Sequence, residues 1–235
     1  MADFVLVHGA WAGAWAWKRV LPGLWSAGHR AFAVSLSGVG ERSHAMSPQI
    51  RLDTHIADVH AVIEAEELQG ALLVGHSYAG MVITGVADRL ADSGRLRHLV
   101  YLDAVVPQPH ESWSSGHAAD TRAARRKAIA ESGVIPPTDP SAFGLEGDDR
   151  AWVLRRQTPQ PGAVYDDALD FDPARVARWP RTFIDCTRPA LATIAVMRQR
   201  VRAEPGWNVV EIATGHLAMV SAPQALLQAL LRAAA

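Results

Sequence analysis

The chain has 235 residues, of which 49% are hydrophobic and 20% charged, a length that suits one sizeable core and not two. Its 23 Lys and Arg residues against 24 Asp and Glu residues give a net charge of −1, which excludes the strongly basic surface that nucleic acid or an anionic membrane requires. No uninterrupted run of about 18 apolar residues is present, so a transmembrane span is excluded too. We expect a single domain over residues 1–235 that binds a small molecule.

The compartment is indicated by cysteine usage and by the N-terminus. The only cysteine, Cys186, has no partner for an internal disulfide. Met1 is followed almost directly by the apolar run at residues 4–7, without the basic region of a signal peptide. Both features predict a cytoplasmic location. We expect no nucleic-acid or membrane partner, and the sequence leaves a homodimer open.

Short apolar runs typical of strands recur along the chain. They lie at residues 4–7, 31–36, 71–74, 99–103, 182–186 and 209–213. Their nearly continuous Val, Leu and Ile residues indicate strands buried on both faces. Helical patterns separate them, and such alternation requires crossover connections. The chain therefore predicts an α/β fold with a mostly parallel six-stranded sheet and helices on both faces.

Two helical patterns can be delimited. One covers residues 53–68, where apolar residues share one face. The other is a C-terminal helix that we expect to begin with a capping box over residues 221–224. Its apolar stripe consists of Leu226, Leu227, Leu230 and Leu231.

The alternation of strand and helix stops between residues 107 and 180. Pro, Gly, charged residues and short helical patterns at 121–131 and 150–157 replace the strands there. An excursion from the carboxyl end of a strand in a parallel sheet lies where such sheets bind ligands. We therefore predict a helical lid insertion over a pocket. Its His110 and His117 are expected to be solvated.

Tryptophans in and near this insertion are candidates for contact with a ligand. Trp113, Trp152 and Trp179 either line the pocket or pack the lid onto the core, and the large area that a tryptophan buries favours packing. Trp113 and Trp152, together with Trp11 of the first loop, are the candidates for substrate binding.

The most informative segment is residues 72–82, LLVGHSYAGMV. A buried strand runs into a turn of small residues and then a helix, which is the context of a nucleophile elbow. Ser77 is the candidate nucleophile, and the N–H of Tyr78 would meet the developing oxyanion. In the usual Gly-x-Ser-x-Gly pattern the last position is glycine; here it is Ala79, and glycine follows at Gly80. The alternative is a glycine-rich turn whose serine merely caps the helix.

A second loop follows the first strand, at residues 7–13, VHGAWAG. Its glycines allow the N–H of Ala10 to serve as the second oxyanion donor. His8 lies at the end of the strand, before the glycine, and we interpret it as a structural histidine that fixes the loop.

The general base is expected late in the chain, in a loop after the last strand. Of the ten histidines, His216 alone has that place, after the run at 209–213 and before the terminal helix. A neutral imidazole there can accept the proton of Ser77.

The motifs, in this order, resemble the α/β-hydrolase superfamily, and within it the small plant-type branch of methyl esterases and hydroxynitrile lyases. The resemblance covers nearly the whole chain and is weakest in the lid. It is carried by FVLVHGA at 4–10, Trp15 and Trp17, GHS at 75–77, FIDCT at 183–187 and GHLAM at 215–219. It implies the α/β-hydrolase fold and a triad in the chain order Ser-acid-His.

The acid of the triad departs from the pattern of that branch. The branch has an aspartate two positions after Cys-Thr, where this chain has Pro189. Hydrolases of this fold can instead place the acid after the strand that follows the nucleophile helix, and Asp103 ends that strand. We assign Asp103, while Asp185, two residues inside its strand, remains a competitor. Either aspartate can also merely cap a loop.

No cofactor or metal is expected. Gly38-Val39-Gly40 begins like a dinucleotide fingerprint, but the third glycine and the following helix are missing. The chain has no phosphate-loop motif, no His-Glu-x-x-His and no Cys-x-x-Cys.

These residues predict a carboxylesterase-type serine hydrolase for a small hydrophobic or aromatic ester, with Ser77 as nucleophile, His216 as base and Asp103 as acid. One alternative is a hydroxynitrile lyase. The lyases of the branch carry threonine and lysine where this chain has Gly9 and Leu217, so a departing cyanide would lack its cationic partner. The other alternative, a small-molecule binding protein with a vestigial triad, stays open.

Overall fold

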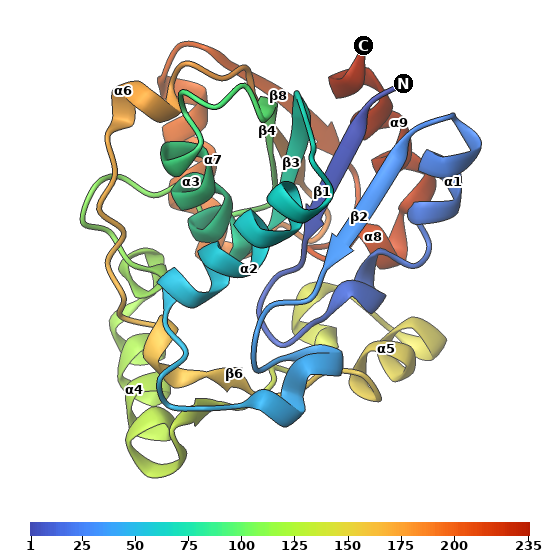
Figure 1. The fold of residues 1–235 in the computed structure, drawn as a ribbon. Helices are drawn as coiled ribbons and strands as arrows, with labels where there is room; N and C mark the ends of the chain where they lie inside the picture. Colours follow the sequence, from blue (N-terminus) through green and yellow to red (C-terminus); the bar gives the residue numbers. More distant parts are fainter.

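The computed structural model describes all 235 residues and contains a parallel sheet between two layers of helices (Figure 1). The strand order is β2-β1-β3-β4-β7-β8, and every neighbouring pair is parallel. The strands are β1 (Asp3–Val7), β2 (Arg30–Val34), β3 (Ala71–His76), β4 (Leu96–Leu102), β7 (Arg181–Cys186) and β8 (Trp207–Ile212). The predicted α/β-hydrolase fold with a six-stranded sheet is confirmed.

Nine α-helices connect and cover the strands (Figure 1). They are α1 (Leu21–Ser26), α2 (Leu52–Ala65), α3 (Ala79–Arg89), α4 (Ala119–Ser132), α5 (Gly147–Leu154), α6 (Pro173–Val176), α7 (Ala195–Ala203), α8 (Ala218–Ser221) and α9 (Pro223–Ala234). Short 3-10 helices are η1 (Ala14–Trp17), η2 (Gly40–Ala45), η3 (Trp113–Gly116), η4 (Pro140–Phe143), η5 (Gly162–Val164) and η6 (Ala192–Ile194).

Side chains of the central strands alternate between two hydrophobic cores. Leu73 and Phe183 belong to the core that contains the buried residues of α2 and α3. Val74 and Ile184, one position further along the same strands, belong to the core under α1, α8 and α9. Each fully buried aliphatic or aromatic side chain contributes about 1.5–3 kcal/mol. The sheet is therefore a rigid base for the residues at its carboxyl edge.

The start of the C-terminal helix differs from the prediction. Ser221 is the last residue of α8, and its hydroxyl lies 2.7 Å from that of Thr214. The helix α9 begins at Pro223, with Ala222 at the N-cap and no side-chain cap. The predicted capping box is therefore wrong, because the serine hydroxyl is engaged by Thr214 and the fixed φ of proline starts the helix instead.

Most of the segment between β4 and β7, with α4 and α5, lies beyond the end to which the strand arrows point, whereas α6 lies toward the opposite end of the sheet (Figure 1). The segment contains α4, α5 and α6, and also a two-stranded antiparallel sheet, β5 (Val134–Ile135) and β6 (Gln160–Pro161), that the sequence did not predict. We call residues 107–180 the lid insertion. No residue of α4 is buried.

The two histidines of the lid insertion differ from each other. His110 is exposed, as expected. His117 is buried, and its Nδ1 lies 2.9 Å from the hydroxyl of Tyr165. Burial and nearby arginines lower its pKa to about 4. The expectation of a solvated His117 is therefore wrong, because its partner comes from 48 residues further along the chain.

Candidate active site

Ser77 lies at the turn between β3 and α3 with a positive φ of 54°, which is the strained conformation of a nucleophile elbow. Two backbone hydrogen bonds hold it there. The N–H of Ser77 donates to the carbonyl of Leu102 (3.2 Å), and the N–H of Val105 donates to the carbonyl of Ser77 (3.0 Å). The turn is thus fixed to the chain that leaves β4, and the serine lies at the carboxyl edge of the sheet.

Gly80 explains the departure from the usual glycine pattern. A Cβ at Gly80 would lie only 1.8 Å from the carbonyl oxygen of Val105, so any side chain there would push α3 away from the end of β4. Ala79, by contrast, is buried and its methyl group is accommodated. The close approach therefore occurs one residue later than in the usual motif.

Asp103 and His216 are in direct contact. The Nδ1 of His216 donates to Oδ2 of Asp103 at 2.7 Å, and both residues are almost fully buried. The structure thus brings together two predicted residues that are 113 positions apart. Because the carboxylate holds the proton on Nδ1, the other ring nitrogen, Nε2, is left without one. An imidazole in this form can act as a general base.

Asp185, the competing acid, is bound by two arginines. Arg198 donates from Nε to Oδ1 of Asp185 at 2.5 Å, and Arg202 donates to Oδ2 at 2.7 Å. Arg198 also donates from Nη2 to Oδ1 of Asp103 at 2.6 Å. One guanidinium of α7 therefore links both aspartates through charge-assisted hydrogen bonds. No signal in the sequence points to Arg198, which lies on a polar helix among other arginines.

Two other buried histidines support the backbone around these residues. Nε2 of His76 lies 2.9 Å from the carbonyl oxygen of His216, to which it donates. His8 donates from Nδ1 to the carbonyl of Gly9 (2.7 Å) and accepts the N–H of Leu36 at Nε2 (3.1 Å). Burial lowers the pKa of His76 well below its ordinary value and that of His8 to about 4. Both rings are neutral, and the structural role predicted for His8 is confirmed, whereas the role of His76 was not predicted.

The two predicted backbone donors lie in different places, Ala10 in the loop after β1 and Tyr78 at the start of α3. Neither the N–H of Ala10 nor that of Tyr78 donates to another group of the chain, and Ala10 lines a cavity together with the candidate nucleophile. Trp11 follows with a positive φ of 63°. Its N–H donates to the side chain of Gln160 (3.0 Å), and its indole N–H donates to the carbonyl of Ile135 (3.1 Å). The lid insertion thus helps to shape this loop.

Two small cavities lie next to Ser77 and His216, which line both of them. One, of about 40 Å³, is also lined by Trp11, Trp113 and Arg125. The other, of about 30 Å³, is lined by residues that include Trp11, Trp15 and Leu217. Such volumes hold a few water molecules.

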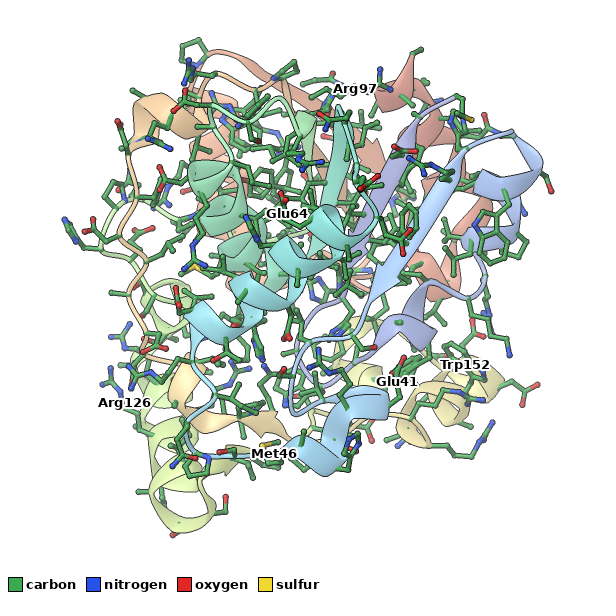
Figure 2. All side chains as sticks on the ribbon, in the orientation of Figure 1. Glu41, Met46, Glu64, Arg97, Arg126 and Trp152 are labelled. Carbon is green, nitrogen blue, oxygen red and sulfur yellow. The ribbon has the colours of Figure 1, made fainter.

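Trp152 lies outside both cavities, and the structure does not support its predicted contact with substrate. Its ring packs edge-to-face on Trp15 at 5.1 Å, and the guanidinium groups of Arg19 and Arg156 lie 5.1 and 4.6 Å from its centre. Figure 2 shows Trp152 on α5, on the other side of the lid insertion from α4. Trp15, and not Trp152, lines the second cavity, and Trp152 packs against the Trp15 ring.

Metal-ligating side chains are not clustered in the structure. No three His, Cys, Asp or Glu side chains gather in a way that could hold a metal ion. None of the helices combines the length and the apolar character needed to cross a membrane.

The comparisons with known proteins identify the family. Residues 4–229 match the model of the alpha/beta hydrolase family. The chain belongs to this family. It is 38% identical to the carbendazim hydrolyzing esterase of Nocardioides sp. (strain SG-4G), over 98% of both chains, and 36% identical over 108 residues to an alpha-hydroxynitrile lyase of Arabidopsis thaliana (44% of this chain, 40% of the lyase).

A solved structure supports the same assignment at the level of the fold. An extracellular alpha/beta-hydrolase from a Paenibacillus species, described as sharing structural and functional homology with tobacco salicylic acid binding protein 2, superimposes with a TM-score of 0.87. It is 19% identical and covers 99% of both chains. The predicted resemblance to the plant-type branch is confirmed, and the chain is a hydrolase enzyme.

Proposed function

We propose that this α/β-hydrolase cleaves carboxylic esters of small hydrophobic or aromatic groups through an acyl-enzyme on Ser77. The observation that carries the proposal is the 2.7 Å contact between Asp103 and His216 beside the cavities that Ser77 lines. A nucleophile, a base and an orienting acid at one sheet edge are the parts that acyl transfer requires. The similarity to an esterase over 98% of the chain supports the same reaction class.

Each residue has one task in the proposed reaction. His216 takes the hydroxyl proton of Ser77 at Nε2 as the oxygen attacks the ester carbonyl, and returns it to the departing alcohol. Asp103 holds the Nδ1–H and stabilises the imidazolium that forms. The N–H groups of Ala10 and Tyr78 stabilise the oxyanion, and each such donor is worth about 10²–10³ in turnover. A water molecule, activated by the same histidine, then hydrolyses the acyl-enzyme.

The apolar walls of the cavities favour a hydrophobic acyl or alcohol group. Trp113, Phe143 and Met197 face the same cavity as the candidate nucleophile, and aromatic walls bind flat or branched apolar groups well.

The structure also weighs against the lyase reaction. A Cβ at Gly9 would lie 2.7 Å from Nδ1 of His76 and 2.9 Å from Cβ of Ser77, so a threonine there would require the elbow to shift. Leu217 gives an apolar wall to the second cavity, where the lyases of the branch have lysine. We therefore expect no release of cyanide from mandelonitrile.

A turnover assay with p-nitrophenyl acetate and butyrate tests the proposal. We expect wild-type turnover with an initial burst of p-nitrophenol, and a loss of at least about 10⁴-fold in the Ser77→Ala variant. Circular dichroism shows whether that variant keeps its fold. Activity of the variant within tenfold of wild type would contradict the proposed nucleophile. Tight binding of the esters without any turnover by the wild-type protein would favour a binding protein.

A further inference from the structure

Two neighbouring arginines of α4 have different environments. Arg126 forms a bidentate pair with Asp166, with contacts of 2.9 and 3.0 Å, and Figure 2 shows it pointing away from the body of the protein. Arg125, the preceding residue, points the other way and lines the cavity shared by Ser77 and His216. The helix thus presents one cation to solvent and one to the candidate active site.

The guanidinium of Arg125 lies among aromatic rings. Its central carbon is 5.3 Å from the ring centre of Trp11, 4.9 Å from that of Trp113 and 5.5 Å from that of Tyr165. Cation–π contacts of this kind offset part of the cost of removing a cation from water. The guanidinium also donates from Nη1 to Nε2 of His117 at 3.4 Å and forms a hydrogen bond with Tyr165. An aromatic face accepts no conventional hydrogen bond, so the other N–H donors of the guanidinium stay available.

Arg125 has no anion to balance its charge. It forms no ion pair with any carboxylate of the chain, in contrast to Arg126. The His117 ring, whose Nε2 accepts from Arg125, is neutral, with a pKa of about 4. Burial lowers the pKa of Arg125, yet a guanidinium remains protonated in proteins. A partly buried cation without an anion is costly, so a ligand that brings a negative charge would gain binding energy here.

We propose that Arg125 binds a carboxylate of the substrate, so that the esters that fit this enzyme best are half-esters: an apolar body with a methyl or similar ester at one end and a free carboxylate at the other. This inference rests on the proposed function and narrows its substrate class. The ester end lies at Ser77 and His216, the apolar body lies against Trp11 and Trp113, and the carboxylate accepts hydrogen bonds from Arg125. Such planar, charge-assisted recognition is what arginine does best.

The first experiment compares matched ester pairs at pH 7.5. Monomethyl succinate, glutarate, adipate and terephthalate are each paired with the methyl ester in which a methyl group replaces the carboxylate, and methanol release is measured. We expect wild-type kcat/KM to favour at least one half-ester by tenfold or more. In Arg125→Met, that half-ester loses about 10- to 100-fold in kcat/KM, mainly through KM, while the neutral partner stays within threefold. Arg125→Lys keeps part of the preference.

Arg126→Met is the matched control, because it removes a cation from the adjacent position outside the cavity. Both kinds of ester should stay within twofold of wild type in this variant. A wild-type preference for the neutral ester in every pair would overturn the inference. So would an equal loss on charged and neutral esters in Arg125→Met, since that would indicate a purely structural role in the lid insertion.

A binding measurement separates this inference from the proposed reaction. In the Ser77→Ala background, titration of the preferred half-ester is followed by tryptophan fluorescence, to which Trp11 and Trp113 contribute. Binding should weaken tenfold or more when Arg125→Met is added and stay unchanged when Arg126→Met is added. If the wild-type protein hydrolyses no ester but this difference holds, the proposed reaction fails and the carboxylate site stands. Equal binding in both double variants would overturn the site itself.

Discussion

The carboxyl edge of the sheet and the lid insertion beyond it differ in the interactions that stabilise them. At the edge, Ser77 and Asp103 directly follow strands that are buried on both faces. The insertion carries a helix, α4, with no buried residue, and one arginine of that helix, Arg126, pairs with Asp166 at the surface. Exposed ion pairs contribute little to stability, whereas buried apolar side chains contribute strongly. The edge is thus suited to fix reacting groups, and α4 of the insertion to move.

This difference has a functional consequence. The cavities beside Ser77 are too small for an ester as they stand, so the part of the molecule that moves on binding has to be the less firmly packed part. We expect substitutions at the edge to change turnover, and substitutions in the insertion to change which ester binds and how well.

Apart from the nucleophile itself, the largest effect is expected at the acid. Asp103→Asn preserves the shape of the site but favours the wrong tautomer of His216, and should lower turnover by up to about 10⁴-fold, the size of effect that the equivalent substitution has in a serine protease. Asp185→Asn should lower turnover less than tenfold, because Asp185 contacts Arg198 and Arg202 and not the histidine. Steady-state kinetics on p-nitrophenyl butyrate measures both. Equal losses in the two variants would contradict the assignment of Asp103.

The second prediction concerns Arg198, which joins the two aspartates. Arg198→Met leaves two buried carboxylates without their shared cation, and breaking a buried pair in this way costs about 3–5 kcal/mol in the free energy of unfolding. Urea denaturation measures the loss. Asp185 keeps its contact with Arg202 in this variant, so the double variant Arg198→Met, Asp185→Asn, compared with both single variants, should lose less than the sum of their losses. A loss in the double variant equal to the sum of the losses in the two single variants would show that the two residues are not coupled.

The parts of the fold and of the candidate site that could be predicted both have local signals in the sequence. The central strands were predicted because a strand buried on both faces is apolar at nearly every position. Ser77 and His216 are candidates because each follows an apolar run within a short motif, although β8, before His216, is an edge strand and only partly buried. Asp103 required the observation that Pro189 occupies the usual place of the acid. Each of these signals lies within a few residues of the position about which it informs.

The features that could not be predicted depend on partners far away in the chain. Arg198 reaches an aspartate 95 residues earlier, and His76 reaches the carbonyl of His216, 140 residues later. Arg125 and Arg126 are indistinguishable in sequence, because their roles depend on which face of α4 meets the aromatic residues. The position of Trp152 has the same origin, since the tertiary contact with Trp15 decides where it packs.

A third prediction compares the two regions through buried histidines. His8 belongs to the edge and His117 to the insertion, and each has a pKa of about 4 in the folded chain against about 6.5 when unfolded. Between pH 4 and pH 6.5 the unfolded chain therefore binds more protons than the folded chain. The stabilisation by the neutral histidines is complete above pH 6.5, and the free energy of unfolding falls as the pH drops toward 4. From pH 7 to pH 5 the loss is up to about 2 kcal/mol per histidine.

Urea denaturation at pH 7 and pH 5 measures this dependence, with His8→Gln and His117→Gln as the variants that should each flatten it. For His117 the opening should be local, so amide exchange at pH 5 should accelerate in α4 before it does in β3 and β4. An unchanged pH dependence in both variants would contradict the neutral, buried state of these rings.

The smallest effect is expected at the tryptophans of the insertion. Trp113→Phe shortens one wall of the cavity and should change KM for p-nitrophenyl butyrate by less than about tenfold, with turnover nearly unchanged, because it removes only part of one apolar contact. Trp152→Phe is the control outside the cavity, and its KM should equal that of the wild type. A larger effect at Trp152 than at Trp113 would place the substrate elsewhere.

The central claim, that Ser77 is the nucleophile activated by His216 and Asp103, is tested most directly by mass spectrometry after reaction with a p-nitrophenyl phosphonate. We predict one adduct per chain, located on the peptide that contains Ser77, absent in Ser77→Ala and formed far more slowly in Asp103→Asn than in Asp185→Asn. An adduct on another residue, or labelling that proceeds at the wild-type rate in Asp103→Asn, would contradict the account.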